Sequence, residues 1–148
     1  MRYVITGLFV FLLDLGVKET IERKESSDVR TFCKGKIRVE RYHNKGAMCN
    51  VLDDKPKFIR AIHTLVLLWF AVYAIFSMKD HGSSGNKFGM SLLFAGGLSN
   101  LYDRYRRGYV VDYLRFKTPW NWLNRMIFNL SDFAIFAGAI LFEINSEK

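Results

Sequence analysis

Long apolar runs alternate with charged stretches along the whole chain. The apolar runs cover residues 3–18, 58–78, 88–106 and 126–143. Runs of about this length can cross a lipid bilayer as helices. The pattern therefore predicts a single domain over residues 1–148, of the mainly α membrane class, with four transmembrane helices.

The polar stretch between the first two runs has a different period. In Lys36–Tyr42, isoleucine and valine alternate with charged residues, which is typical of a strand with one buried face. Asn44–Ala47 has the composition of a turn, and Cys49–Leu52 is the predicted return strand. We therefore expect a small β-sheet within residues 18–57.

A second polar segment precedes the fourth apolar run. Residues 116–125 combine Trp120 and Trp122 with a proline, lysine, arginine and asparagines, a composition typical of segments that lie in the lipid headgroup layer. Four spans would place both termini on one side of the membrane. The small sheet and the interfacial segment would lie together on the other side.

The formal net charge of +8 has two interpretations. No nucleic-acid-binding module is recognisable, and the basic residues flank the apolar runs, so we expect contact with anionic lipid and no nucleic-acid partner. Cys33 and Cys49 are too few for a zinc site, and we expect free thiols unless their loop is extracytoplasmic. No metal or cofactor is expected.

The third apolar run carries polar residues that are costly at membrane depth. Asn100, Asp103 and Arg104 are spaced to share one helical face, and charged groups there cost roughly 2.5 to 3.5 kcal/mol each on insertion scales. Arg104 or Arg107 could neutralise Asp103, whereas Asp112, just beyond the helix, has no such immediate partner. Asp112 is therefore the better candidate for a catalytic carboxylate.

The fourth run supplies a second carboxylate. Asn129 and Asp132 are three residues apart near its start and share a face. Two aspartates that meet near a membrane surface suggest an acid/base pair. Asp14 and Lys18, four residues apart in the first run, can pair at the membrane boundary, where an ordinary helix-end ion pair and a functional role remain alternatives.

Four segments in the same order resemble the motifs of signal peptidase II, the bacterial lipoprotein signal peptidase, a family of aspartic peptidases. These segments are Asp14–Lys18, Asn44–Ala47, Gly96–Asp112 and Phe128–Asp132. The last two are the specific ones. Three departures indicate a divergent member: Ser99 and Ser131 stand where the family has glycine and alanine, and Met48-Cys49 replaces alanine and an aromatic residue.

The resemblance implies an intramembrane endopeptidase that cleaves prolipoproteins before the diacylglyceryl-modified cysteine. It assigns catalysis to Asp112 and Asp132. The remaining roles that it implies are substrate binding or support of the carboxylates for Asn44, Gly46, Asn100, Arg104 and Asn129, a structural role for Asp14 and Lys18, and a positioning role for Asp103, which is also the alternative catalytic carboxylate. No metal takes part.

The resemblance also implies partners and a location. The partners would be prolipoprotein substrates and membrane lipids, with the enzyme a monomer in the bacterial cytoplasmic membrane and its active site toward the extracytoplasmic face. The distribution of charge opposes this orientation, because residues 18–60 and 104–125 hold eighteen of the 22 Lys and Arg residues, and basic loops are usually cytoplasmic. A non-catalytic lipopeptide-binding protein or a small transporter is the alternative function, since intramembrane charges alone do not distinguish these classes.

Overall fold

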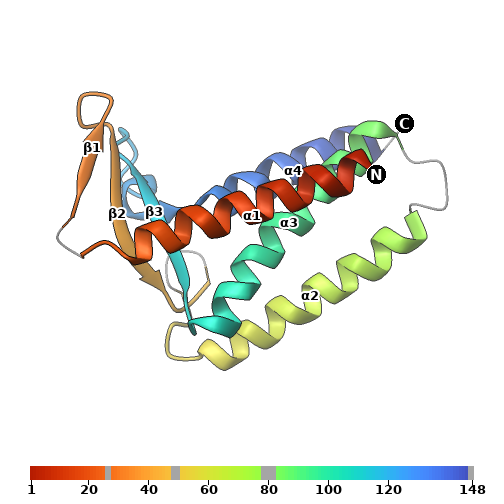
Figure 1. The fold of residues 1–148 in the computed structure, drawn as a ribbon, viewed down its shortest axis with the longest axis horizontal. Coiled ribbons are helices and arrows are strands. Elements are labelled where there is room, and N and C mark those ends of the chain that lie inside the picture. Colours follow the sequence, from red (N-terminus) through yellow and green to blue (C-terminus); the bar gives the residue numbers. More distant parts are fainter. Residues whose placement is uncertain (26–27, 48–50, 78–82, 147–148) are drawn as a thin grey trace.

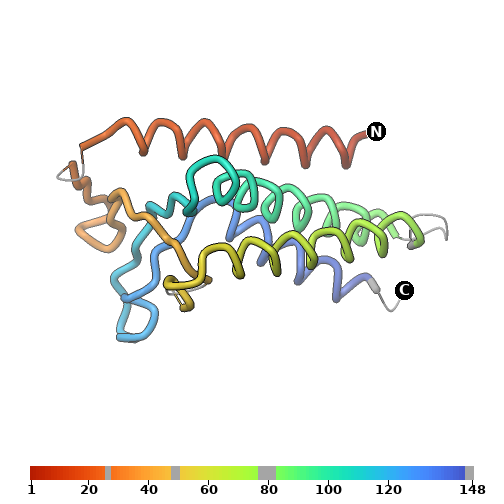
Figure 2. Tube along the Cα trace, turned by 90° about the horizontal axis from the view of Figure 1, so that it is seen from below, coloured from red at the N-terminus to blue at the C-terminus, as the bar shows by residue number. Residues whose placement is uncertain are grey.

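The computed structural model describes residues 1–25, 28–47, 51–77 and 83–146. Within these residues the chain forms a bundle of helices with a small antiparallel sheet at one end (Figure 1). The helices are α1 (Arg2–Glu22), α2 (Pro56–Ser77), α3 (Ser84–Arg106), α4 (Leu130–Ser146) and the short 3-10 helix η2 (Leu123–Arg125). The start of α1 and the end of α4 lie at the same end of the bundle, away from the sheet (Figures 1 and 2).

Helix α3 is the centre of the bundle, because it packs against α1, α2 and α4. Glycines allow its closest approach to α4. A Cβ atom on Gly89 would lie 2.7 Å from the carbonyl oxygen of Gly138, and a Cβ on Gly96 would lie 2.5 Å from that of Ser131. Small residues permit such close backbone packing between helices, and this contact brings the polar end of α3 against the start of α4.

The sheet contains the strands β1 (Arg30–Phe32), β2 (Ile37–Asn44), β3 (Val110–Phe116) and β4 (Ile127–Phe128), in that spatial order. All neighbouring pairs are antiparallel. In the β2–β3 ladder, Asn44 pairs with Val110 and Tyr42 with Asp112. The sheet therefore joins the stretch after α1 to the stretch after α3.

The predicted return strand at Cys49–Leu52 is wrong in its described part. Val51 and Leu52 lie in a turn, and Leu52 has a φ of 61°, which a strand does not accommodate. Cys49 lies outside the described residues. β2 instead pairs with β1 and β3, because pairing with β3 covers the buried Val111 and Tyr113, which pack with Ile21 of α1.

The predicted start of the fourth span also differs. Residues 126–129 were expected inside the fourth span, but Ile127–Phe128 forms β4 and α4 begins at Leu130. In the segment before it, Trp120 and Trp122 are 61% and 60% exposed. Their location in the headgroup layer remains a prediction. Cys33 is a free, exposed thiol, as expected.

The helix bundle is apolar outside and polar inside. Large apolar side chains are exposed on α1, α2 and α4, including Phe9, Leu65 and Ile140, while Asp14 and Lys18 are fully buried. Of the helices in the described residues, α2 alone is long and apolar enough throughout to be a candidate span, over Pro56–Phe76. The sequence predicted four, but α1 and α3 carry charged residues, and α4 has 17 residues.

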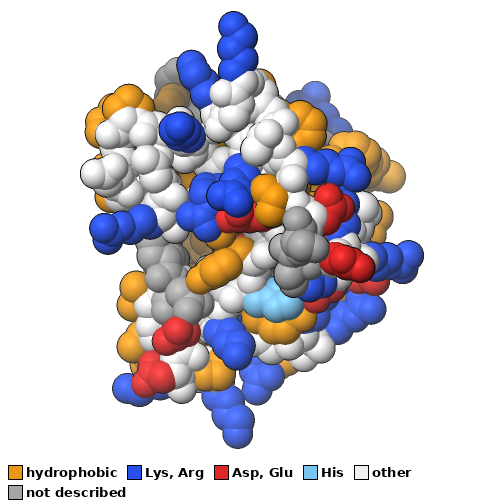
Figure 3. Space-filling model, turned by 90° about the vertical axis from the view of Figure 1, so that its left-hand side faces the viewer, with side chains coloured by type: hydrophobic (Ala, Val, Ile, Leu, Met, Phe, Trp, Pro, Cys, Tyr) orange, Lys and Arg blue, Asp and Glu red, His pale blue; other side chains and the backbone are white. Residues whose placement is uncertain are grey.

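The sheet end of the molecule has a contrasting surface. Seen from this end, Lys and Arg side chains predominate over Asp and Glu (Figure 3). The bundle and the sheet therefore present an apolar and a basic surface, respectively.

Candidate active site

Strand β3 delivers Asp112 to the junction between the sheet and the helices. Its side chain is only 3% exposed. One carboxylate oxygen accepts a hydrogen bond from Asn129 Nδ2 at 2.7 Å, and the other accepts one from Asn44 Nδ2 at 3.0 Å. Amides from the next strand and from the residue before α4 therefore hold both oxygens of Asp112.

Asp132 is placed by the first turn of α4. Asn129 precedes this helix, and its Oδ1 accepts a hydrogen bond from the Asp132 backbone N–H at 3.0 Å. The Asp132 carboxylate in turn accepts one from the Asn129 backbone N–H at 2.9 Å. This reciprocal arrangement is a capping box. Asn129 therefore connects the two aspartates, because its side-chain amide also binds Asp112.

The two aspartates line one cavity of about 140 Å³. Asn44, Asn100 and Arg104 also line it, together with apolar side chains that include Phe128 and Phe136. Asn100 donates to the free oxygen of the Asp132 carboxylate at 3.0 Å. The structure thus brings together the predicted catalytic carboxylates and four of the predicted supporting side chains, counting Asn129, which contacts both.

Arg104 has hydrogen-bonding capacity to spare in this cavity. Its Nη2 donates to the Gly46 carbonyl oxygen at 2.6 Å, while Asn44 Oδ1 accepts from the Gly46 N–H at 3.1 Å and holds the turn. The buried Nε and Nη1 of Arg104 have no hydrogen-bond partner among the described residues. Leaving buried donors unpaired is costly, so these two groups are suited to a ligand carbonyl.

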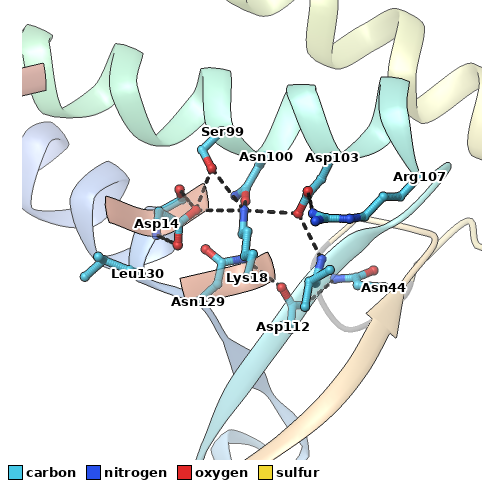
Figure 4. Close-up of polar contacts among 12 residues, drawn as sticks. Asp14, Lys18, Asn44, Ser99, Asn100, Asp103, Arg107, Asp112, Asn129 and Leu130 are labelled. Atoms are coloured by element: carbon cyan, nitrogen blue, oxygen red, sulfur yellow. Dashed lines mark hydrogen bonds and ion pairs between the residues drawn. The ribbon is translucent and has the colours of Figure 1, made fainter. Parts of the chain in front are cut away.

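A second polar cluster lies beside the cavity and centres on Lys18 (Figure 4). Its ammonium group is fully buried, 2.8 Å from Asp14 and 3.3 Å from Asp103. It also donates to Asn100 Oδ1 at 2.7 Å. The sequence predicted the Asp14–Lys18 pair but placed it at the helix end, with no link to α3.

Asp103 belongs to this second cluster. Its carboxylate binds Lys18 and Arg107, and it accepts the Val111 backbone N–H at 3.1 Å. It is fully buried and does not line the cavity. Of the two cationic partners that the sequence suggested, the structure places Arg107 on Asp103 and Arg104 at the cavity.

Sequence reasoning missed a role for two serines. Ser99 and Ser131 each donate a hydroxyl hydrogen bond to Asp14 Oδ2 at 2.5 Å, and Lys18 donates to Ser99 Oγ at 3.2 Å. These are the two positions at which the chain departs from the family's glycine and alanine. That simultaneous departure was the available signal, because each new hydroxyl in an apolar helix needs a hydrogen-bond partner.

Burial raises the pKa of Asp112 to about 7, and the negative charge of Asp132 adds to this increase. The hydrogen bonds from Asn44 and Asn129 act in the opposite direction, because they favour the ionised carboxylate. A carboxyl group with this pKa is protonated in about half of the molecules near neutral pH. In the part of the chain that the structure describes, no group of three or more His, Cys, Asp or Glu side chains is arranged to bind a metal.

Two aspartates that line one cavity, with one member able to hold a proton, are characteristic of aspartic peptidases. The family model described as "Signal peptidase (SPase) II" matches residues 6–147. The chain therefore belongs to the signal peptidase II family.

Similar proteins agree in sequence and in fold. The chain is 31% identical over 141 residues to the "Lipoprotein signal peptidase" of Caldicellulosiruptor bescii, covering 95% of this chain and 87% of that protein. It is 33% identical over 142 residues to that of Halothermothrix orenii, covering 95% and 91%. A solved bacterial membrane enzyme superposes with a TM-score of 0.84 at 28% identity, covering 97% of this chain and 85% of that one.

Proposed function

We propose that this aspartic endopeptidase cleaves prolipoproteins before their diacylglyceryl-modified cysteine, with Asp112 and Asp132 as the catalytic pair. One observation carries the residue assignment: both carboxylates face the same cavity, and Asn129 is hydrogen-bonded to both. Neither carboxylate has a cationic side chain at ion-pair distance among the described residues. Both therefore keep their proton-transfer capacity.

In the proposed reaction Asp112 carries the proton and Asp132 is ionised. Asp132 removes a proton from a water molecule as the water oxygen attacks the scissile carbonyl carbon. Asp112 donates a hydrogen bond to the carbonyl oxygen and stabilises its developing negative charge. When the C–N bond breaks, the proton held by Asp132 passes to the leaving amine. The products are the free signal peptide and the lipoprotein with its modified cysteine at the N-terminus.

Arg104 would hold the substrate main chain. Arg104 lines the cavity, and its buried Nε and Nη1 have no partner among the described residues, so they would be available to donate to a peptide carbonyl. Asn44 and Gly46 support this role, because the Gly46 carbonyl fixes the guanidinium and Asn44 fixes the Gly46 turn. Asn100 and Asn129 orient the two carboxylates.

The bundle would cross the bacterial cytoplasmic membrane four times, with the sheet toward the extracytoplasmic side and the protein a monomer. The exposed apolar surfaces of α1, α2 and α4 support this placement, since such surfaces are stable in lipid. The start of α1 and the end of α4 would then be cytoplasmic. Reporter fusions at residues 82–85 and at residue 148 test the orientation, and extracytoplasmic signals from both would contradict it.

Cleavage of a diacylglyceryl-modified prolipoprotein by the purified protein tests the function. We expect the wild type to produce a mobility shift on a gel and Asp112→Asn to produce none, because the amide of asparagine is a much weaker hydrogen-bond donor to the developing oxyanion than a carboxylic acid. Binding of the uncleaved lipopeptide should persist in the variant.

The same pair of measurements separates the alternatives. Binding without cleavage by the folded wild type would indicate a lipopeptide-binding protein or a transporter. Cleavage by Asp112→Asn at the wild-type rate would contradict the assignment of the pair while leaving the activity in place.

A further inference from the structure

One face of the β2–β3 ladder, remote from Asp112, carries a group of basic side chains. Arg38 pairs with Arg115 in the register, and the Lys117 N–H donates to the Lys36 carbonyl oxygen at 2.8 Å. Alternate residues of a strand point to the same face. Lys36, Arg38, Arg115 and Lys117 are therefore neighbours on one face, and we call them the basic quartet.

The charge of the basic quartet is poorly compensated. Glu40 is its one carboxylate partner among the described residues, and it is shared: Arg115 Nε is 2.6 Å from Oε1 and Arg38 Nε is 3.0 Å from Oε2. Lys36 and Lys117 have no ion pair with the described residues and are exposed. Like charges placed opposite each other destabilise a sheet, so this face would gain stability from an anion.

The quartet surrounds a depression in the surface. All four side chains line a cavity of about 330 Å³, together with Val29, Thr31 and Asn124. The position of Asn124 is fixed, because its side-chain amide holds Thr118 through both its oxygen and its nitrogen. The site is therefore a shaped pocket, large enough for a phosphate group, and not only a scatter of surface lysines.

The surroundings of the pocket indicate a lipid source for the phosphate. Phe116, between Arg115 and Lys117, also lines this pocket. Its ring centroid is 6.0 Å from those of Phe128 and Phe133, in a tilted and an edge-on arrangement respectively. On the following connection, Trp120 and Trp122 are largely exposed. Aromatic side chains and exposed tryptophans close in sequence to cations are typical of segments that lie in the lipid headgroup layer, where the phosphates are.

We infer that the basic quartet is a binding site for the phosphate group of an anionic phospholipid. This inference rests on the proposed membrane placement of the bundle but not on the catalytic pair. Bound lipid would anchor the β2–β3 ladder, which carries Asn44 and Asp112 at its other end, against the membrane surface.

Native mass spectrometry of the full chain in a neutral detergent tests the inference with phosphatidylglycerol and phosphatidylcholine of matched acyl chains. We expect tighter binding of phosphatidylglycerol by the wild type and roughly tenfold weaker binding by Lys36→Gln/Lys117→Gln. The matched control is Lys55→Gln/Lys57→Gln, which removes two exposed positive charges near the start of α2. It should bind like the wild type, as should Lys36→Arg/Lys117→Arg.

The other outcomes overturn the inference. Equal loss in the two glutamine variants would reveal a general charge effect, and equal affinity of the wild type for both lipids would exclude recognition of the anionic headgroup. If millimolar inorganic phosphate abolished the preference for phosphatidylglycerol over phosphatidylcholine, the pocket would be a site for a soluble anion. Asp112→Asn should keep the lipid preference, so a failure of the proposed catalytic pair is distinguishable from a failure of this site.

Discussion

Two groups of aspartates lie side by side in this protein and have opposite surroundings. Asp14 and Asp103 share the buried ammonium group of Lys18, and Asp103 also binds Arg107. Asp112 and Asp132 are held by neutral amides and face a cavity. Asp14, Asp103 and Asp112 are all buried and Asp132 is half-buried, so burial alone does not separate carboxylates with a structural role from the proposed catalytic ones.

The difference lies in the partners of the carboxylates. A carboxylate paired with a cation is stabilised in its ionised form and is a weak proton carrier. A buried carboxylate beside another carboxylate keeps its proton to higher pH, and hydrogen bonds from neutral amides oppose this effect only in part. Asn100 connects the two groups, because its Oδ1 accepts from Lys18 and its Nδ2 donates to Asp132. Asn100 therefore links the paired group to the proposed catalytic pair, and the charge of Lys18 also acts on both Asp112 and Asp132.

Substitution of the aspartates should separate the two groups most strongly. We expect Asp132→Asn to lower kcat/KM for prolipoprotein cleavage by roughly 10³-fold or more, because it removes the general base, with little change in thermal stability. Asp103→Asn should mainly lower the melting temperature and retain cleavage per folded molecule within about tenfold. The opposite ranking would make Asp103 the catalytic carboxylate.

The second largest effect is expected from replacing Lys18, the cation that Asp14 and Asp103 share. Lys18→Met would leave Asp14 and Asp103 without their common partner, and breaking a buried ion pair costs roughly 3 to 5 kcal/mol of unfolding free energy. Thermal unfolding in detergent measures this loss, with the exposed Lys57→Met as a control of near-zero effect. Adding Asp14→Asn to Lys18→Met should recover part of the stability, and strictly additive losses would exclude the proposed coupling.

The pH profile of cleavage should report the protonation of Asp112. Because its pKa is raised to about 7, activity should fall as the pH rises through this value and the proton is lost. Asn44→Ala removes a hydrogen bond that favours the ionised form, so the alkaline limb of kcat/KM should move to higher pH. A shift to lower pH would assign this limb to another group.

The smallest effects are expected from replacing the two serines that bind Asp14. Ser99→Gly and Ser131→Ala each remove a hydroxyl hydrogen bond to buried Asp14, at a cost of roughly 1 to 3 kcal/mol. Cleavage per folded molecule should stay within a few-fold of wild type, since neither serine lines the cavity. Thermal unfolding and the gel assay measure the two effects separately, and a loss of activity without destabilisation would place the serines in the reaction.

Much of this protein could be predicted from the order of its residues. The four helices follow from long apolar runs, because such runs bury their backbone polar groups only as helices in lipid. The spacing of Asn129 and Asp132 predicts that they share a face, and they form the capping box at the start of α4. The choice of Asp112 and Asp132 came from the motif resemblance and, for Asp112, from the absence of an immediate cationic partner, and their catalytic role stays a prediction.

Only the tertiary structure decided which distant residues meet. The sequence left open whether Arg104 or Arg107 pairs with Asp103, since both lie within one helical turn of it. The close packing of α3 against α1 decided this, because it directs Lys18 and Arg107 to Asp103 and leaves Arg104 on the cavity side. Likewise, Ser99 of α3 and Ser131 of α4 both bind Asp14 of α1. Local spacing determines which residues share a face, but the partner of that face depends on how the helices pack.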